Sequence, residues 1–177
     1  MARDVHEYVA RLVWDGNTGM GTATYAVYGR QYRFLVDGKA ELEGTADPKF
    51  RGDPGKHNPE EHFLAAIAGC HMLSYLALCA RQGVTVLAYE DDVRGALKFD
   101  GRGGGKFEEV VLHPTVTIAK DDDPELAASL HERAHELCFI AASCSVPIRH
   151  EATVRVAGRG GVNGGPRPRQ LSTRPGP

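Results

Sequence analysis

Two cysteines in this sequence stand where thiol chemistry could take place. Cys70 lies inside the apolar run from Phe63 to Ala80, and Cys138 lies in a later segment with a helical pattern. A thiol in apolar surroundings has a raised pKa and is inert unless a cation or a dipole lowers that pKa. Chemistry at Cys70 therefore requires a positive group beside it and a carboxylate that holds this group in place.

Candidates for both partners precede the apolar run. Arg51 lies in a polar loop, and Glu60 lies at the start of the expected helix. Glu60 and Cys70 are ten residues apart, which is about 15 Å along one helix, so they cannot share a site within one straight helix. The same helix from a second copy, lying antiparallel, would bring one copy's Glu60 to the other copy's Cys70.

Cys79 and Cys144 complete the set of four cysteines, and no CxxC pair is present. The sequence therefore offers neither a zinc knuckle nor a thioredoxin motif. Cys79 is nine residues past Cys70 and falls on the opposite face of the helix. We expect Cys79 and Cys144 to be buried, inert thiols, whereas Cys138 could approach Cys70 from the second helix.

The elements that must position these residues are expected in the order β-β-β-α-β-β-α-β, an α+β single domain with an antiparallel sheet. Asn58 suits the N-cap of the first helix and Pro59 its first position. This helix is apolar nearly all round, so it must be buried on every side, and we expect a second subunit to help. The expected strands cover residues 5–14, 22–28, 32–36, 84–99, 107–119 and 146–156, and the second helix covers about 125–140.

Composition limits the classes of function. The net charge of -2 and the pI near 6.4 give no basic field that would attract nucleic acid or a membrane. We expect no membrane-spanning segment, and the N-terminus has no apolar signal-peptide core, which favours the cytoplasm. Residues 1–156 are expected to form the domain, and the Gly/Pro/Arg-rich residues 157–177 a disordered tail.

Two segments carry a family resemblance. The segment Asn58-Pro-Glu-Glu-His-Phe-Leu-Ala-Ala-Ile-Ala-Gly-Cys70-His71 resembles the NPE…AC/GC helix of the OsmC/Ohr family. This family comprises the osmotically inducible protein C and the organic hydroperoxide resistance proteins. The segment His135-Glu-Leu-Cys138-Phe-Ile-Ala resembles the second cysteine helix of the same family. The resemblance covers about residues 5 to 156.

The resemblance implies an intertwined homodimer with two sites at the subunit interface. Cys70 would be the peroxidatic thiolate that reduces organic hydroperoxides, and Cys138 would condense with its sulfenic acid to a disulfide. Glu60 would orient an arginine against the thiolate, which lowers the thiol pKa and stabilises the developing alkoxide. The resemblance implies no bound cofactor and an external dithiol, in some members a lipoylated protein, as reductant.

This chain departs from the family pattern at three points. The activating arginine precedes the NPE motif at variable spacing, so Arg51 is the expected residue, with Lys49, Arg33 and Arg30 as alternatives. The Cys-Pro that often marks the second cysteine is Cys138-Phe139 here. Cys144 follows six residues later and could resolve in place of Cys138.

Two other interpretations compete with a peroxidase. His131, His135 and Cys138 fall at i, i+4 and i+7 on one helix face and are candidate zinc ligands, which His113 or His71 would complete. The second alternative is a non-enzymatic dimer that senses redox state or binds an apolar ligand with the same cysteines. A sensor would oxidise once, whereas a peroxidase would turn over with a dithiol.

Overall fold

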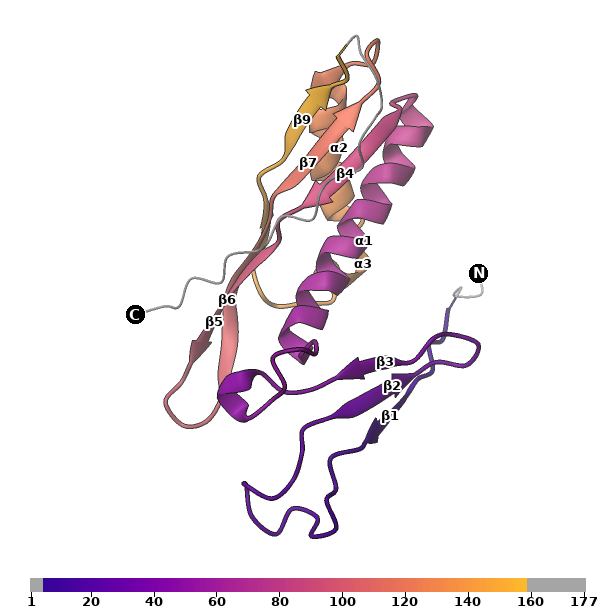
Figure 1. The fold of residues 1–177 in the computed structure, drawn as a ribbon. Helices are drawn as coiled ribbons and strands as arrows, with labels where there is room; N and C mark the ends of the chain where they lie inside the picture. The colour runs from indigo at the N-terminus through magenta and orange to yellow at the C-terminus, as the bar shows by residue number, and fades with distance from the viewer. Residues whose placement is uncertain (1–4, 159–177) are drawn as a thin grey trace.

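The computed structural model of the protein describes residues 5–158, which form the expected α+β fold (Figure 1). The predicted tail lies outside the described residues from position 159 onward. The strands are β1 (Arg11–Trp14), β2 (Tyr32–Leu35), β3 (Leu42–Gly44), β4 (Val86–Asp91), β5 (Arg94–Phe99), β6 (Gly105–Leu112), β7 (Pro114–Ile118), β8 (Ile148–His150) and β9 (Thr153–Val156). The helices are a 3₁₀ turn, η1 (Pro48–Phe50), and the α-helices α1 (Pro59–Gln82), α2 (Pro124–Glu136) and α3 (Phe139–Ala142).

The N-terminal strands form the predicted antiparallel meander, in the order β1-β2-β3. The prediction of a strand over 22–28 is wrong, and β3 is the third strand. The guanidinium of Arg30 lies over the rings of Tyr25 and Tyr28, at 4.3 and 4.0 Å from the ring centroids. It also donates a hydrogen bond to the Tyr25 carbonyl at 2.8 Å. These contacts fold the segment around one cation, which a flat strand would not allow.

The six strands β4 to β9 form two three-stranded sheets that meet where the three predicted strands are interrupted. Each of the three predicted strands is present but is divided in two, at Asp92–Val93, at His113 and at Glu151–Ala152. The backbone N–H of His113 donates to the Asp91 carboxylate at 2.7 Å instead of to a neighbouring strand. The upper halves pair in the order β4-β7-β9 and the lower halves in the order β5-β6-β8.

The prediction of an antiparallel sheet is only partly right. β4 pairs with β7 and β5 with β6 in antiparallel register, but β8 is parallel to β6 and β9 is parallel to β7. The helices α2 and α3 connect β7 to β8. This connection lets β8 run parallel to β6, and β9 parallel to β7. A parallel pair requires such a crossover, which no hairpin can supply.

Helix α1 begins and ends as predicted. The Asn58 side chain accepts a hydrogen bond from the N–H of Glu61 at 2.9 Å, and the Glu61 carboxylate accepts from the N–H of Asn58 at 3.2 Å. This capping box, followed by Pro59, fixes the start of the helix. Gly83 ends it with a φ of 76°, in the left-handed region that glycine adopts without strain.

The described residues do not enclose α1 on every side, as expected for a helix that a single domain can barely bury. Its buried residues, Ile67, His71, Tyr75 and Cys79, form a single stripe at four-residue spacing, whereas Leu73 is 65% exposed. Among the described residues, α1 is also long and apolar enough, by length and composition, to cross a membrane, contrary to the sequence-based expectation. Its outer face therefore presents apolar side chains, such as Leu73, that the described residues do not cover.

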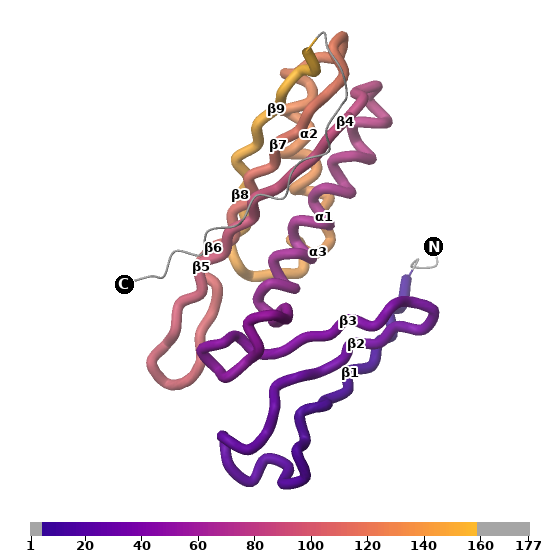
Figure 2. The backbone as a smooth tube through the Cα atoms, in the orientation of Figure 1, coloured from indigo at the N-terminus to yellow at the C-terminus, as the bar shows by residue number. Residues whose placement is uncertain are grey.

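The second predicted helix is interrupted. Helix α2 ends at Glu136, and Leu137 and Cys138 separate it from the short α3. Cys138 has φ -75° and ψ 104°, which is extended backbone, so it occupies the N-cap of α3 and is not in a helix. Helices α1 and α2 pack together on the β4-β7-β9 sheet, and α3 lies against α1 (Figure 2).

The β1-β2-β3 sheet is set apart from the helices and the bent sheet (Figures 1 and 2). It is joined to them through the segment between β3 and α1, where the N–H of Thr45 donates to the His57 carbonyl at 2.9 Å. Its large apolar side chains are exposed: Tyr8 and Val9, which precede β1, Leu12 and Trp14 on β1, Phe34 on β2 and Leu42 on β3. An isolated three-stranded sheet with exposed apolar residues on its strands is a surface that another chain can cover.

Candidate functional site

The structure brings Cys70 and Cys138 together. Cys70 projects from the middle of α1, and Cys138 caps α3, which packs against α1. The two cysteines are close enough that Cys70 contributes to the raised pKa of the Cys138 thiol, and both are free. The described chain thus holds a pair of reduced thiols, 68 positions apart in sequence, close enough to interact within one subunit.

The surroundings of the two thiols differ. Cys138 is 1% exposed, and burial raises the pKa of its thiol to about 11. The N–H of Ala141 donates to the Cys138 sulfur at 3.4 Å and opposes this shift, while the neighbouring Cys70 adds to it. Cys70 is only half-buried. Because the thiolate is the nucleophile, the buried Cys138 is a poor first attacker, and the more accessible Cys70 is the better one.

Glu60 lies far from this thiol pair in the same chain. It occupies the second position of α1, and the helix runs without interruption past Cys70, so about 15 Å of helix separate the two residues. One of its carboxylate oxygens, Oε2, is buried and has no hydrogen-bond partner among the described residues. A buried carboxylate oxygen without a donor is costly, so Glu60 is free to accept a hydrogen bond that none of the described residues supplies.

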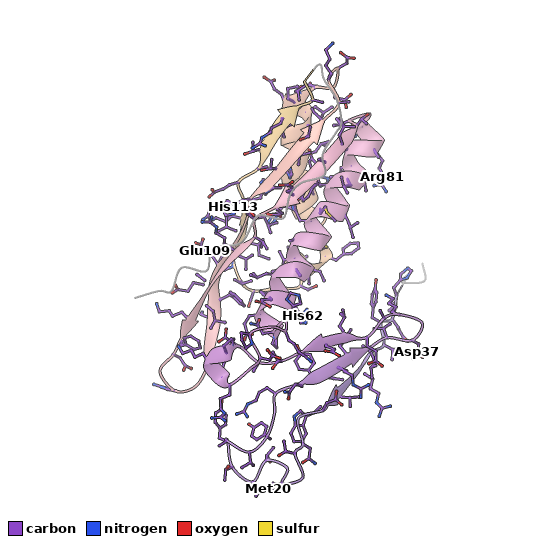
Figure 3. All side chains as sticks on the ribbon, in the orientation of Figure 1. Met20, Asp37, His62, Arg81, Glu109 and His113 are labelled. Carbon is purple, nitrogen blue, oxygen red and sulfur yellow. The ribbon has the colours of Figure 1, made fainter. Side chains whose placement is uncertain are left out.

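A cavity of about 330 Å³ surrounds Glu60. Tyr32 of β2 is close enough that the Glu60 charge, after burial, contributes to the raised pKa of its hydroxyl. The cavity has apolar walls from Phe50, Leu64, Leu97, Phe99 and Phe107. His62 lies on the first turns of α1, at the same end of the helix (Figure 3).

Of the candidate cations, Lys49 lies in the wall of the Glu60 cavity, and Arg51 bonds to the N-terminal loop. Arg51 follows η1 with a φ of 69°, and its guanidinium donates to the Ala26 carbonyl at 3.3 Å. The Lys49 ammonium lies 4.0 Å from the centroid of the Phe99 ring, in the wall of the Glu60 cavity.

Arg33 and Arg30 are engaged in the N-terminal sheet and its loop. Arg33 pairs with the Asp15 carboxylate at 2.7 Å, and Arg30 lies over the tyrosine rings described above. Each of these two cations therefore has a local anionic or aromatic partner. Lys49 is the candidate that lines the Glu60 cavity, and Arg51 follows it two residues later in the chain.

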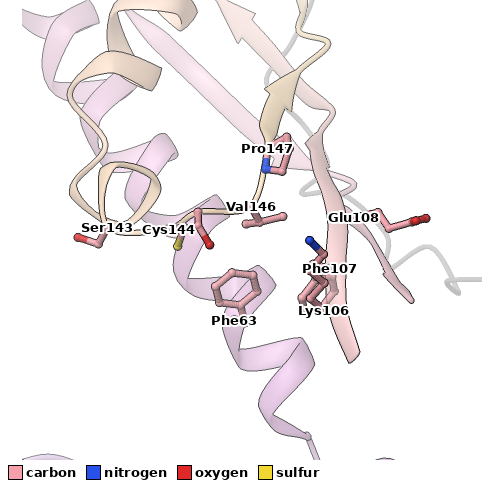
Figure 4. A pocket seen from close by; sticks show the side chains of 9 residues that line it. Phe63, Lys106, Phe107, Glu108, Ser143, Cys144, Val146 and Pro147 are labelled. Carbon is pink, nitrogen blue, oxygen red and sulfur yellow. The ribbon is translucent and has the colours of Figure 1, made fainter. Parts of the chain in front are cut away.

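Cys144 opens onto a separate groove of about 760 Å³ (Figure 4). Phe63, Phe107, Val146 and Pro147 give this groove apolar walls, and Lys106 and Glu108 add charge. Cys144 is half-buried there, which differs from the expectation of a buried thiol. The contact that the structure gives to Cys70 is with Cys138.

Cys79 is buried as predicted. It is 1% exposed, packs beside Tyr75 in the core between α1, α2 and the sheet, and burial raises the pKa of its thiol. A thiol with these properties contributes packing and little reactivity.

The structure does not support the zinc interpretation. Among the described residues, no group of three or more His, Cys, Asp or Glu side chains is arranged to hold a metal ion. Cys138 lies beyond the end of α2, so it does not continue the helix face of His131 and His135. Nδ1 of His131 instead faces Nε2 of His71, at 3.1 Å.

The sequence reasoning missed this contact between histidines. His71 directly follows Cys70, and His131 comes seven residues before Cys138, so each is close in sequence to one cysteine. A histidine close in sequence to each cysteine is the signal that could have indicated the contact.

The fold and the thiol pair define a class of protein: a small α+β domain with a cysteine on a long central helix and a second cysteine at the end of a crossover helix. The family model described as OsmC-like protein matches residues 52–152, more than half of the chain. The chain belongs to this family.

Solved structures and relatives agree with this assignment. An OsmC-like protein of unknown function from Vibrio cholerae is 30% identical, with a TM-score of 0.75 over 84% of this chain and 99% of the other. The uncharacterized protein YmaD of Bacillus subtilis is 27% identical over 86% of this chain and 97% of its own. An organic hydroperoxide resistance protein from Legionella pneumophila shares the fold at 17% identity, with a TM-score of 0.58 over 86% of this chain and 98% of its own.

Proposed function

We propose that this protein is a thiol peroxidase that reduces organic hydroperoxides with Cys70 and Cys138. The observation that carries the proposal is the contact between the two thiols, one half-buried on α1 and one fully buried at the start of α3. Family membership supports it, because structural relatives include organic hydroperoxide resistance proteins.

The reaction has two chemical steps in this subunit. The Cys70 thiolate attacks one oxygen of the hydroperoxide, the O–O bond breaks, and the departing alkoxide takes up a proton to become the alcohol. Cys70 is left as a sulfenic acid. The Cys138 thiol then attacks that sulfur, a disulfide forms, and the hydroxyl leaves with the thiol proton as water. An external dithiol reduces the disulfide by exchange.

The thiolate and the alkoxide both require a positive group, which we assign to Arg51 held by Glu60. One subunit separates Glu60 from Cys70 by about 15 Å of helix, so the pairing requires a second copy with its α1 antiparallel to the first. Three observations support this homodimer: the orphaned Glu60 oxygen, the exposed apolar face of α1, and the β1-β2-β3 sheet set apart with its apolar residues exposed.

The apolar walls of the Glu60 cavity favour organic substrates. Phe50, Leu64 and Phe99 would contact an alkyl or aryl group, whereas hydrogen peroxide would gain nothing from them. We therefore propose alkyl, aryl or lipid hydroperoxides as the substrate class.

Two serine variants test the mechanism. With one equivalent of cumene hydroperoxide, Cys70→Ser should consume no peroxide, because the first nucleophile is absent. Cys138→Ser should consume one equivalent and stop at a sulfenic acid that dimedone traps. Peroxide consumption by Cys70→Ser at the wild-type rate would contradict the assignment, and mass spectrometry of the trapped products separates the two outcomes.

A further inference from the structure

Four histidines gather behind the thiol pair, in a place that the proposed chemistry does not use. His71 comes from α1, His131 and His135 from α2, and His150 from β8. The ring centroids of His71, His131 and His150 lie 5.4 to 5.9 Å apart, and His135 lies 6.0 Å from His150. His71 is 1% exposed and His131 is 0% exposed.

His71 and His131 form a direct hydrogen bond. Nε2 of His71 lies 3.1 Å from Nδ1 of His131, and the two ring planes differ by only 7°. A centroid separation of 5.4 Å with this nitrogen contact places the rings edge to edge in one plane. The two nitrogens face each other and share one proton, whereas metal ligands would have to converge on a third point.

The surroundings of His71 and His131 fix the position of the His131 ring and keep both imidazoles neutral. The Tyr75 ring stacks on His131 at 3.8 Å, and the Tyr75 hydroxyl donates to the Ala127 carbonyl at 3.1 Å. Burial, and then the neighbouring histidines, lower the pKa of His71 to about 4 and that of His131 to about 3. The titratable groups that face the pair are Tyr75, His135, His150, and Glu132, which binds Nε2 of His150 at 3.3 Å.

The hydrogen bond joins the two elements that carry the cysteines. His71 is the residue after Cys70, and His131 lies in the last two turns of α2, just before the chain reaches Cys138. The N–H of Cys138 in turn donates to the carbonyl of His135 at 3.2 Å. The position of Cys138 therefore depends on where the end of α2 lies relative to α1.

We propose that the His71–His131 hydrogen bond is a positioning contact that holds Cys138 against Cys70 and so sets the rate of disulfide formation. The inference rests on the proposed peroxidase function and concerns only its second step. In that step, the Cys138 sulfur bonds to the Cys70 sulfur, the S–O bond breaks, and water leaves. Displacing a reacting group by about 1 Å costs on the order of 100-fold in rate, so loss of this contact should slow the step strongly.

The experiment compares three variants that differ in one hydrogen bond. His131→Leu removes the ring nitrogen that bonds to His71, and His131→Asn keeps a hydrogen-bonding amide near the position of Nδ1. Tyr75→Phe is the matched control, because it removes another buried hydrogen bond between α1 and α2, one turn farther from Cys70, and keeps the ring stack. Each protein is mixed rapidly with one equivalent of cumene hydroperoxide, and sulfenic acid and disulfide are quantified by dimedone trapping and mass spectrometry.

We expect His131→Leu to consume the first equivalent of peroxide at nearly the wild-type rate but to form the disulfide about ten-fold more slowly or worse, with sulfenic acid accumulating. His131→Asn should restore disulfide formation, and Tyr75→Phe should lower only the stability. If His131→Leu does not fold, His131→Gln replaces it in the experiment. The glutamine amide extends beyond the position of Nδ1, so it does not align with Nε2 of His71.

Three results would overturn the inference alone. They are disulfide formation at the wild-type rate in His131→Leu, disulfide formation slowed equally in Tyr75→Phe, or binding of one equivalent of Co²⁺ by the histidines of the wild type. A wild-type protein that consumes no hydroperoxide would overturn the proposed function, and the inference with it. The peroxide and disulfide measurements on the wild type therefore separate the two failures.

Discussion

The buried imidazoles of His71 and His131 resist protonation. Both are essentially without solvent contact, and burial together with the neighbouring histidines lowers their pKa values from 6.5 to about 4 and about 3. In the unfolded chain the same two side chains take up protons near pH 6.5. Between these values the unfolded state binds more protons than the folded state, so acid favours unfolding.

We therefore predict that the free energy of unfolding decreases as the pH falls below 6.5. Two protons give a slope of about 2.7 kcal/mol per pH unit from this pair near pH 5, in addition to the contributions of carboxylates. Urea unfolding followed by circular dichroism between pH 4.5 and 7.5, at fixed protein concentration, measures it. His71→Gln should lose about half of this slope, and an unchanged slope in that variant would contradict the buried-histidine account.

At the scale of elements, the sequence predicted the helix boundaries that are set by residues within one turn. The start of α1 was readable because Asn58, Pro59 and Glu61 act on the backbone within one turn. The interruption between α2 and α3 could not be predicted, because neither Leu137 nor Cys138 is a helix-breaking residue. The extended backbone there depends on α3 packing against α1.

The common bend of the sheet was missed for the same reason. No glycine or proline stands at Asp92 or Val93, and the bend follows from the His113 backbone bonding to Asp91 across the sheet. Only the break at His113 carries a local signal, because Pro114 follows it and has no N–H to donate. At Asp92–Val93 and Glu151–Ala152, pairing between distant strands and not local preference divides the elements.

The site shows the same division between local and distant information. The resemblance to a family motif implied that Cys70 and Cys138 meet, whereas their spacing alone did not fix the distance between them; in the structure Cys70 contributes to the raised pKa of Cys138. The His71–His131 pair depends on the packing of α1 against α2, and no single segment encodes that packing. The partner of the Glu60 carboxylate lies outside one chain in our proposal, so one sequence pattern could not place it.

At the scale of the whole molecule, the exposed apolar surface is the basis of the proposed homodimer. Leu73 on the outer face of α1 and Leu12 on β1 are each 65% exposed, and the β1-β2-β3 sheet is set apart from the core. An antiparallel pair of α1 helices would bury this surface and bring each Glu60 to the other subunit's Cys70.

Sedimentation equilibrium tests this arrangement. We predict a dimer for the wild type and for Leu73→Met, which keeps an apolar side chain. Leu73→Asp should weaken dimerisation about ten-fold or more, because burying a leucine contributes about 1.5–3 kcal/mol. A wild-type monomer at micromolar concentration would contradict the shared site.

The most direct test of the central claim is steady-state peroxide consumption by the purified protein with dithiothreitol as the recycling dithiol, comparing cumene hydroperoxide with hydrogen peroxide. The account predicts repeated turnover with a clear preference for the organic peroxide, and transient oxidation of Cys70 and Cys138. An absence of turnover, with both cysteines still free thiols after exposure, would contradict it and leave a domain that keeps the fold for binding alone.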